Sequence, residues 1–225
     1  MDIEIFNQLE KILINEKEPS VAISGMMKTE KFNKSDFSII RKLEDIPQEK
    51  KYHPEGNVWN HTKMVVDMGA KIKNLSDDAR SFMWATLLHD IGKIPTTKFI
   101  NGRYRSYNHD TEGAEMVYKL LNKYGYTELT EDVGELVRYH MHHIYIIKNL
   151  PFSNIEGLLS SKKFNDIILL FICDKLGRGN QDINEYKHSL GEVFLILDKL
   201  EKESNIKYYE LRNKIKEFEK IIYKE

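Results

Sequence analysis

Histidines that could bind a metal or move a proton are concentrated in one part of this sequence. Of its 8 histidines, all but one fall between positions 53 and 143. Imidazole is the commonest metal ligand among side chains and titrates near neutral pH, so such a cluster suits metal binding or acid–base chemistry. Clustering alone is weak support, because a single histidine on an apolar helix face is usually a hydrogen-bonded core residue. The histidines are His53, His61, His89, His109, His140, His142, His143 and His188.

Two aspartates each follow a strongly apolar segment. Residues 82–88 lead into His89 and Asp90, and residues 167–173 lead into Asp174. If these segments are buried helices, both carboxylates leave water and lie at the partially negative end of a helix dipole, so each needs a cation. One such carboxylate could be protonated, or paired with a single lysine or arginine. Two of them, with histidines nearby, are better explained by a shared divalent ion.

His61 is the other histidine expected at this ion. It follows an N-terminal helix signal at Asn57 and continues an apolar stripe at positions 65, 68 and 72, so its ring should point toward the core. Two imidazoles and two carboxylates suit a borderline or hard divalent cation. The predicted metal ligands are therefore His61, His89, Asp90 and Asp174.

Three further histidines are candidates for a second metal position or for proton transfer. His140 continues the apolar face of residues 133–137, and His143 lies about one turn further on. His109 begins a predicted helix, whose positive end disfavours imidazolium and keeps the ring able to ligate. The remaining histidines are expected outside the site, with His142 projecting sideways and both His53 and His188 on the surface.

Two cations follow the acidic positions by about one helical turn. Lys93 comes after His89, and Arg178 comes after Asp174, so each could direct a positive charge at a phosphate oxygen. The segment 94–109 is the longest irregular stretch expected inside the compact part and is a candidate rim over the site, the alternative being a solvated surface loop. Its cations are Lys98, Arg103 and Arg105.

The elements that must position these residues are predicted to be helices. The chain has 5 prolines, none after position 151, and apolar residues recur at helical spacing. No segment alternates convincingly between apolar and polar residues and is bounded by hairpin turns. The last two helices carry lysine and glutamate on most turns and could form a lid, an appendage or a contact surface for oligomerisation. Predicted helices are 3–15, 35–44, 57–75, 77–91, 110–123, 130–142, 153–160, 163–177, 182–201 and 205–223.

Composition excludes several classes of protein. The formal charge of −1 gives no global field to attract nucleic acid or anionic lipid, so neither duplex DNA nor a membrane is an expected partner. The single cysteine, Cys173, excludes an intramolecular disulfide and fits a reducing compartment, where it is expected to be a small buried apolar residue. An acidic N-terminus and the lack of an apolar run of about 18 residues favour a cytoplasmic protein.

The order of these residues resembles that of the HD superfamily of metal-dependent phosphohydrolases, in which His61, the His89–Asp90 pair and Asp174 occupy the motif positions. More narrowly, the chain resembles the HD domain attached to bacterial CCA-adding tRNA nucleotidyltransferases, over about residues 45–180. The matching blocks are residues 53–62 (HPEGNVWNHT), 87–93 (LLHDIGK), 108–109 (NH) with 113–114 (GA), and 137–141 (VRYHM).

The resemblance implies an all-α HD-domain helical bundle with additional N- and C-terminal helices. We expect residues 1–225 to form a single HD-type domain, with its core at about 45–180 and a C-terminal helical appendage at 181–225. The resemblance places the metal on the four predicted ligands, and His109 and His140 match the positions that complete a second site in two-metal members. No Asp-x-Asp pair occurs in the sequence, so tailing of tRNA with CTP and ATP is not expected.

The preferred function is hydrolysis of a nucleotide phosphomonoester or phosphodiester by direct attack of water activated by the metal. A 2′,3′-cyclic phosphate or an RNA terminus is a candidate substrate. One or two divalent ions are expected, and Mn, Ni, Mg, Fe and Zn all remain open. Asp90 would bridge two ions or orient the nucleophile, and His140 or His143 could protonate the leaving alkoxide. The alternatives are a metal-containing binding or scaffold module without turnover, and a buried polar network without metal.

Overall fold

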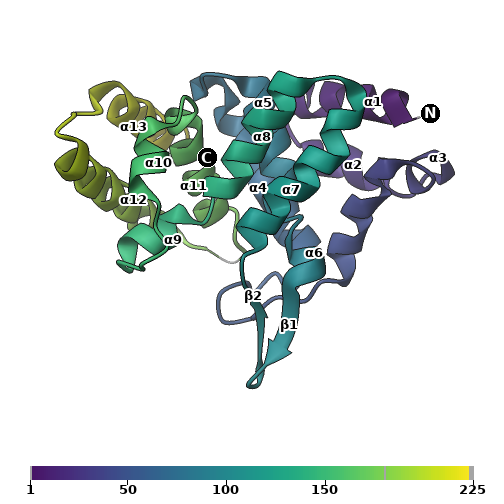
Figure 1. Ribbon diagram of the computed structural model, residues 1–225, viewed down its shortest axis with the longest axis horizontal. Coiled ribbons are helices and arrows are strands. Elements are labelled where there is room, and N and C mark those ends of the chain that lie inside the picture. Colours follow the sequence, from purple (N-terminus) through teal and green to yellow (C-terminus); the bar gives the residue numbers. More distant parts are fainter. Residues whose placement is uncertain (1, 180, 223–225) are drawn as a thin grey trace.

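The protein is almost entirely helical, which confirms the predicted all-α class (Figure 1). The computed structural model describes residues 2–179 and 181–222. In this part of the chain, no helix is both long and apolar enough to cross a bilayer. The first half contains α1 (Asp2–Asn15), α2 (Pro19–Met26), α3 (Glu30–Asn33), the 3-10 helix η1 (Asp36–Asp45), α4 (Val58–Ile72), η2 (Lys73–Leu75), α5 (Ala79–Leu88) and α6 (Lys93–Thr96). The second half contains β1 (Thr97–Ile100), β2 (Arg103–Ser106), α7 (His109–Leu121), η3 (Asn122–Tyr124), α8 (Thr127–Tyr139), α9 (His142–Ile147), α10 (Ile155–Ser160), α11 (Phe164–Leu176), α12 (Ile183–Ser204) and α13 (Tyr209–Ile222).

Local capping explains where several of these helices begin. The Asn57 side chain accepts a hydrogen bond from the Asn60 amide at the start of α4, and Asp78 does the same for the Arg80 amide at the start of α5. At α12, Asp182 and Glu185 form a capping box. Each cap satisfies backbone N–H groups that have no partner inside the first turn. The positions of these helices are therefore fixed by side chains within a few residues.

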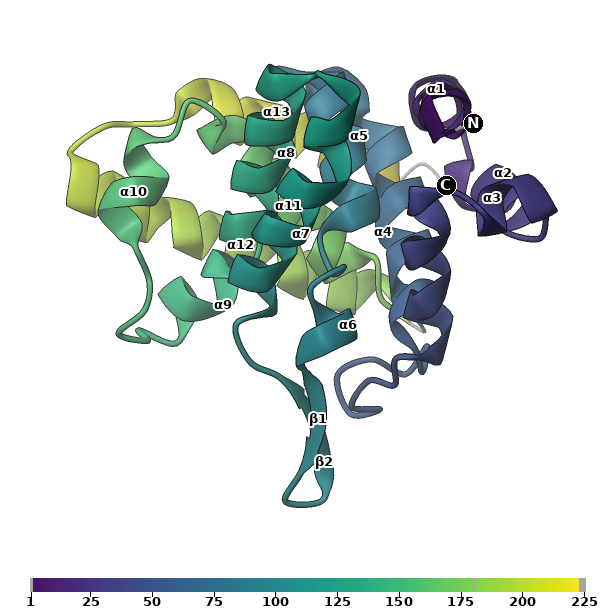
Figure 2. The same ribbon diagram turned by 45° about the vertical axis from the view of Figure 1, so that its right-hand side comes forward.

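Four helices, α4, α5, α8 and α11, form the centre of the bundle. α5 packs against α4, α8 and α11, and α7 packs along α8 (Figure 2). The apolar segments of α5 and α11 are buried along almost their whole length, as residues 82–88 and 167–173 predicted. Since an element that is apolar on all sides must be covered by others, these two helices become the interior of the bundle. The chemistry-bearing ends of both helices are thereby buried as well.

The terminal helices are joined to this centre by apolar contacts. In α1, Phe6 stacks on Trp84 of α5 with ring centroids 5.0 Å apart. In α13, Leu211, Ile215 and Phe218 are buried, so this helix is not a wholly solvated appendage. Buried residues from α1 to α13 belong to one continuous apolar cluster. We therefore propose that the chain is a single domain.

The prediction of an irregular loop at 94–109 was wrong, because this segment forms regular structure. It contains the short helix α6 and an antiparallel hairpin in which Thr97 pairs with Ser106 and Ile100 with Arg103. Asn101 and Gly102 form the turn with φ of +50° and +74°. An Asn-Gly pair with positive φ at both positions is typical of a two-residue hairpin turn. The signal was present, but strands of four residues with little burial give no clear alternation.

Other boundaries also differ from the predicted ones. The predicted helix 130–142 is two elements, because α8 ends at Tyr139 and α9 begins at His142. The segment predicted as a helix at 35–44 is the 3-10 helix η1, and the short helices α2, α3 and α6 were not predicted. Elements of only four to eight residues have too little apolar periodicity to be found in this way. The break between α8 and α9 matters, since it turns His140 and His143 toward the bundle interior.

Gly92 sets how closely α7 approaches the end of α5. A β-carbon built at this residue would overlap the His109 carbonyl oxygen and the Gly113 nitrogen, both of them backbone atoms. The chain cannot relieve such an overlap by rotating a side chain, so α7 would have to move. The small residue at this position therefore keeps His109 near Asp90.

We expect Gly92→Ala to lower the free energy of unfolding by about 1–3 kcal/mol, because overpacking against backbone forces the helices apart. The matched control is Gly191→Ala in α12, where a β-carbon would meet nothing within 4 Å. That change should raise stability by about 0.5–1 kcal/mol through helix propensity. Urea unfolding followed by circular dichroism measures both. Equal stability of the two variants would show that the approach of α7 does not depend on Gly92.

Candidate metal centre

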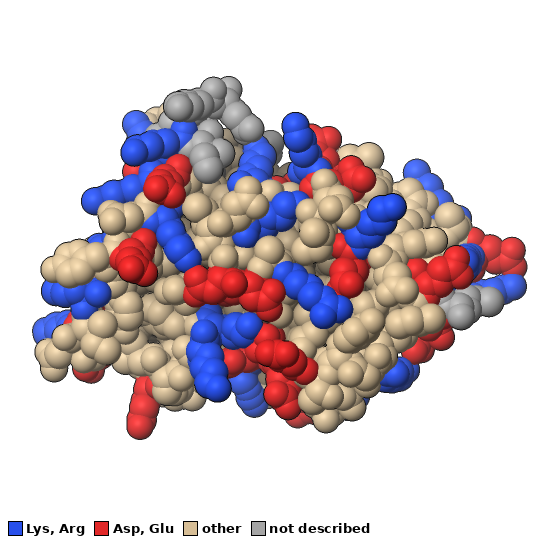
Figure 3. Space-filling view, turned by 90° about the horizontal axis from the view of Figure 1, so that it is seen from above, with Lys and Arg blue, Asp and Glu red and all other residues tan. Residues whose placement is uncertain are grey.

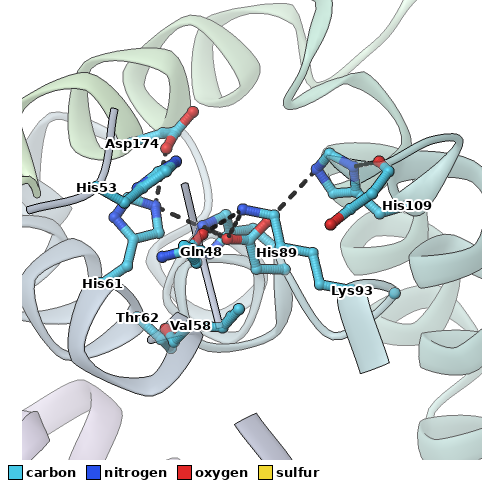
Figure 4. A network of polar contacts seen from close by, with 12 residues as sticks. Gln48, His53, Val58, His61, Thr62, His89, Lys93, His109 and Asp174 are labelled. Atoms are coloured by element: carbon cyan, nitrogen blue, oxygen red, sulfur yellow. Dashed lines mark hydrogen bonds and ion pairs between the residues drawn. The ribbon is translucent and has the colours of Figure 1, made fainter. Parts of the chain in front are cut away.

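Seven imidazole and carboxylate side chains from six helices or their ends converge in the bundle interior. They come from α4, the turn after α5, the start of α7, the end of α8, α9 and the last turn of α11. All are almost fully buried, with exposed fractions from 0% to 5%. Figure 4 shows several of them facing one another. The seven are His61, His89, Asp90, His109, His140, His143 and Asp174.

Asp90 lies between two pairs of imidazoles. Its Oδ2 atom is 3.4 Å from His89 Nε2 and 3.8 Å from His61 Nε2. Its Oδ1 atom is 3.4 Å from His109 Nε2 and 3.7 Å from His140 Nε2. Ligand atoms of His61, His89 and Asp90 lie within 4.8 Å of one another. The same holds for ligand atoms of Asp90, His109 and His140. Asp90 therefore presents one oxygen to each of two positions that could hold an ion.

Asp174 faces the same site from the opposite helix. Its Oδ1 atom is 2.9 Å from His61 Nε2, the atom that also faces Asp90. Its Oδ2 atom is 3.5 Å from His143 Nε2. The two buried carboxylates, 84 residues apart in the sequence, thus converge on one histidine.

Hydrogen bonds to the backbone fix the orientation of all five rings. The Nδ1 atoms lie 2.5–3.0 Å from carbonyl oxygens, and these pairs are His61 with Gly177, His89 with Thr86, His109 with Ser106, His140 with Val137 and His143 with His140. An Nδ1–H group that donates to a carbonyl leaves the Nε2 lone pair free. Metal-ligating histidines almost always have their other ring nitrogen held in this manner. The Nε2 atoms of all five rings point at the two carboxylates.

Unsatisfied buried atoms test whether a cation fits. Among the described residues, His89 Nε2 and His143 Nε2 are buried without a hydrogen-bond partner, and each faces a carboxylate oxygen. Unpaired Nε2 lone pairs facing carboxylate oxygens repel each other and lose the energy of hydration. A divalent cation would satisfy both kinds of atom at once, and mixed imidazole and carboxylate donors suit Mn, Fe, Ni or Zn. The donor set therefore fits a divalent metal ion.

The electrostatics keep both carboxylates charged. Burial alone would raise the pKa of Asp90, but Lys93 and His89 outweigh it and hold that pKa well below its ordinary value. For Asp174, burial is likewise outweighed by its hydrogen bond to His61 and the charge of Arg178, so its pKa is also well below the ordinary value. Burial lowers the pKa of His109 and that of His143, each to about 3. These two rings are thus neutral near pH 7, as a ligand must be. For His61, burial lowers the pKa, but hydrogen bonds to Asp174 and Glu55 outweigh it and raise that pKa to about 8.

The two predicted phosphate-binding cations have different surroundings. Lys93 Nζ is 2.7 Å from Asp90 Oδ2, as an ion pair, and 2.7 Å from Gln48 Oε1, to which it donates a hydrogen bond. Arg178 follows Asp174 and lines the same cavity as Lys93. This cavity has a volume of about 470 Å³ and reaches Asp90, His109, His143 and Asp174. Both cations therefore border a space large enough for a small substrate beside the seven-residue cluster.

The structure adds residues that the sequence analysis missed. His53 was expected on the surface, but its side chain is only 15% exposed and lines the cavity, so that expectation was wrong. Its Nδ1 lies 2.9 Å from the Glu55 carboxylate, which is also 3.3 Å from His61 Nδ1. Burial lowers the pKa of His53 to about 4. Glu55 thus supports His61 from behind, and no periodicity in the irregular segment 47–57 indicated this.

The other two histidines lie apart from the cluster. His142, expected to project sideways, is buried between Tyr139 and Tyr145, with ring centroids 4.6 and 5.3 Å away. It lines a second cavity on the other side of His109. His188 has a side chain that is 79% exposed, as expected.

This fold and the site of histidines and aspartates define the class of protein. The sequence profile of the HD domain matches residues 58–179, which is more than half of the chain, so the chain belongs to the HD domain family. This family is associated with metal-dependent phosphohydrolases, in agreement with a buried cluster that can hold a divalent ion. The resemblance drawn from the motifs is therefore confirmed.

Curated relatives that the chain matches include proteins described as "Multifunctional CCA protein". The chain is 26% identical over 157 residues to a "Multifunctional CCA protein" of Actinobacillus pleuropneumoniae, covering 67% of this chain and 38% of that protein. It is 29% identical to the protein of the same name from Neisseria meningitidis, covering 65% and 36%. With that of Haemophilus influenzae it shares 24% identity over 84% and 49%. The chain thus spans between about a third and a half of the length of the relatives it matches.

We expect Mn²⁺ at about 100 times its Kd to stabilise the protein by about 2.7 kcal/mol, because the ion binds only the folded cluster. For a chain of this size, that raises Tm by roughly 5–10 °C. In Asp90→Asn the rise should be largely lost. The matched control is Asp110→Asn, since Asp110 is also buried but bonds Tyr145 outside the cluster. An undiminished Mn²⁺ response in Asp90→Asn would contradict the assignment of the site.

Proposed function

We propose that this protein is a metal-dependent phosphohydrolase that cleaves a phosphomonoester or phosphodiester of a nucleotide or of an RNA end. The observation that carries the proposal is the convergence of five Nε2 atoms on Asp90 and Asp174, beside a cavity that Lys93 and Arg178 line. The Nε2 atoms of His109 and His143 face carboxylate oxygens beside the cavity, and Lys93 and Arg178 line it. This combination suits a phosphate group more than a neutral substrate.

We propose His61, His89, Asp90 and Asp174 as the ligands of the first ion. His109 and His140 would complete a second position, which Asp90 Oδ1 faces. Divalent ions held by these residues would supply Lewis acidity, which neutralises phosphate charge and lowers the pKa of bound water toward 7. The candidate metals for these imidazole and carboxylate donors are Mn, Ni, Mg, Fe and Zn.

The chain's own residues would bind and orient the substrate. Arg178 carries its guanidinium at the cavity wall and can pair with two phosphate oxygens in a planar geometry. Lys93 stands over Asp90 and can exchange part of that ion pair for a phosphate oxygen. His143 has a buried Nε2 with no hydrogen-bond partner among the described residues and lines the cavity, and its ring is neutral near pH 7, so it is placed to ligate.

The similarity to CCA proteins supports a substrate related to RNA. Those relatives are named for the CCA sequence, and the matching blocks lie in the part of this chain that holds the cluster. A 2′,3′-cyclic phosphate or a terminal phosphomonoester presents the same kind of anion to the cavity. The class of substrate is thus a nucleotide phosphate, with an RNA terminus as the preferred form.

We expect the purified protein with Mn²⁺, Ni²⁺ or Mg²⁺ to hydrolyse bis-p-nitrophenyl phosphate or a 2′,3′-cyclic nucleotide. His89→Ala and Asp174→Asn should each lower kcat/KM by at least about 100-fold, since loss of a ligand exceeds the effect of losing one of its supporting partners. His188→Ala, on the exposed face of α12, is the control and should retain activity. Absence of turnover with every metal and nucleotide would leave a metal-binding module and refute the proposed enzyme.

A second experiment separates the two ion positions. We expect about two Mn²⁺ per chain by isothermal titration, and about one in His140→Ala, because only the Oδ1 side of Asp90 loses a donor. His89→Ala should impair the other position. A single ion in the unaltered protein, unaffected by His140→Ala, would restrict the centre to one metal and leave His140 for proton transfer.

A further inference from the structure

The β1–β2 hairpin stands apart from the rest of the molecule in position and composition. In both views the two strands extend beyond the helices, below α6 (Figures 1 and 2). Residues 97–107 read TKFINGRYRSY and contain three cations, three aromatic residues and no acidic residue, in a chain whose net charge is −1. By contrast, the face shown in Figure 3 carries blue and red side chains interspersed. Residues 97–107 therefore differ from that face, because their charged side chains are all positive.

The register of the hairpin sorts its side chains onto two faces. Phe99 is opposite Tyr104, and Thr97 is opposite Ser106, so these four share one face. Tyr104 and Ser106 line the cavity of the metal centre, and Phe99 lies beyond Tyr104 with ring centroids 5.0 Å apart. The cavity wall is thus extended outward by an aromatic surface. Phe99 is 65% exposed and Tyr104 40% exposed, so both rings can be reached from solvent.

The cations lie on the other face of the same ribbon. Lys98 is opposite Arg105, and Arg103 is opposite Ile100. Within the described ranges, neither Lys98 nor Arg103 forms an ion pair, while Arg105 donates a hydrogen bond to the Tyr107 hydroxyl. Because the ribbon is only two strands wide, long side chains on one face extend past its edge. They can contact phosphates of a strand whose bases stack on the other face.

Two adjoining cavities lie at the base of the hairpin. A second cavity of about 470 Å³ shares Ser106, Tyr107, His109 and Met141 with the cavity of the metal centre. Tyr139, His142, Tyr145 and Phe152 contribute aromatic rings to its walls, beside polar residues that include Asp110 and Arg138. Aromatic rings offer stacking surfaces to any unpaired base, whatever its sequence. The second cavity therefore offers an unpaired base a place to stack next to the metal centre.

We propose that the β1–β2 hairpin binds the single-stranded end of an RNA, so that the terminal phosphate enters the metal centre while preceding nucleotides lie along the hairpin. This inference rests on the proposed function for the terminal phosphate, but the binding surface is defined by the hairpin alone. The substrate is then an RNA strand of several nucleotides, not a free nucleotide. Double-stranded RNA does not fit, since its paired bases cannot stack on Phe99 or Tyr104.

The test is binding of a ten-nucleotide single-stranded RNA with a 5′ fluorophore and a 3′ hydroxyl, measured by fluorescence anisotropy on the intact chain with Mn²⁺. Lys98→Gln/Arg103→Gln should weaken binding about tenfold and make it less dependent on salt. Phe99→Ala should weaken it about five- to tenfold through lost stacking. The matched control is Lys34→Gln/Lys119→Gln, which removes two exposed cations elsewhere and should leave binding unchanged.

Hydrolysis of bis-p-nitrophenyl phosphate separates this inference from the proposed function. The three variants should retain the activity of the unaltered protein, since none of the changed residues lines the cavity. Hairpin-dependent binding of RNA would support the inference even if the protein hydrolysed no ester. Binding that is equal in hairpin and control variants, or equal for a duplex of the same length, would overturn it whatever the activity.

Discussion

The burial of two negative charges is the constraint on which the rest of this structure depends. Asp90 and Asp174 are 2% and 4% exposed, and both follow helices that are apolar on nearly every side. A buried carboxylate without a counter-charge costs several kcal/mol, and two facing the same imidazole cost more. Lys93 and Arg178 supply part of the positive charge. Five inward Nε2 atoms that face these two carboxylates indicate where the remaining positive charge belongs.

The packing of the central helices brings the two carboxylates and the histidines together. α5 and α11 bring the acids into the interior, and α4 lies against both, so that His61 faces Asp90 and Asp174 together. The break between α8 and α9 turns two histidines of one segment toward different carboxylates. Backbone carbonyls then hold each ring in place. The terminal helices add apolar contacts far from the site, as the stacking of Phe6 on Trp84 illustrates.

The sequence predicts the main helices and the convergence of the acids for a definite physical reason. An apolar run that ends in Asp is informative, because burial forces the carboxylate to find a cation. The role of Glu55 and the burial of His53 could not be found, since they lie in an irregular segment with no periodicity. The hairpin was missed because its strands are short and exposed, although Asn101–Gly102 is a turn signal. Which oxygen of Asp90 faces which ring depends on packing that spacing alone does not define.

Anomalous diffraction can test directly whether Asp90 and Asp174 share a metal ion. The crystals would contain the intact chain, purified without added metal or chelator. We predict an anomalous peak between Asp90 and Asp174 at the absorption edge of a transition metal. The peak should lie within about 2.0–2.6 Å of their oxygens and of the histidine Nε2 atoms. Full density for a Lys93–Asp90 ion pair, with no peak even after soaking in Mn²⁺, would contradict it. The cluster would then be a buried polar network closed by Lys93 and Arg178.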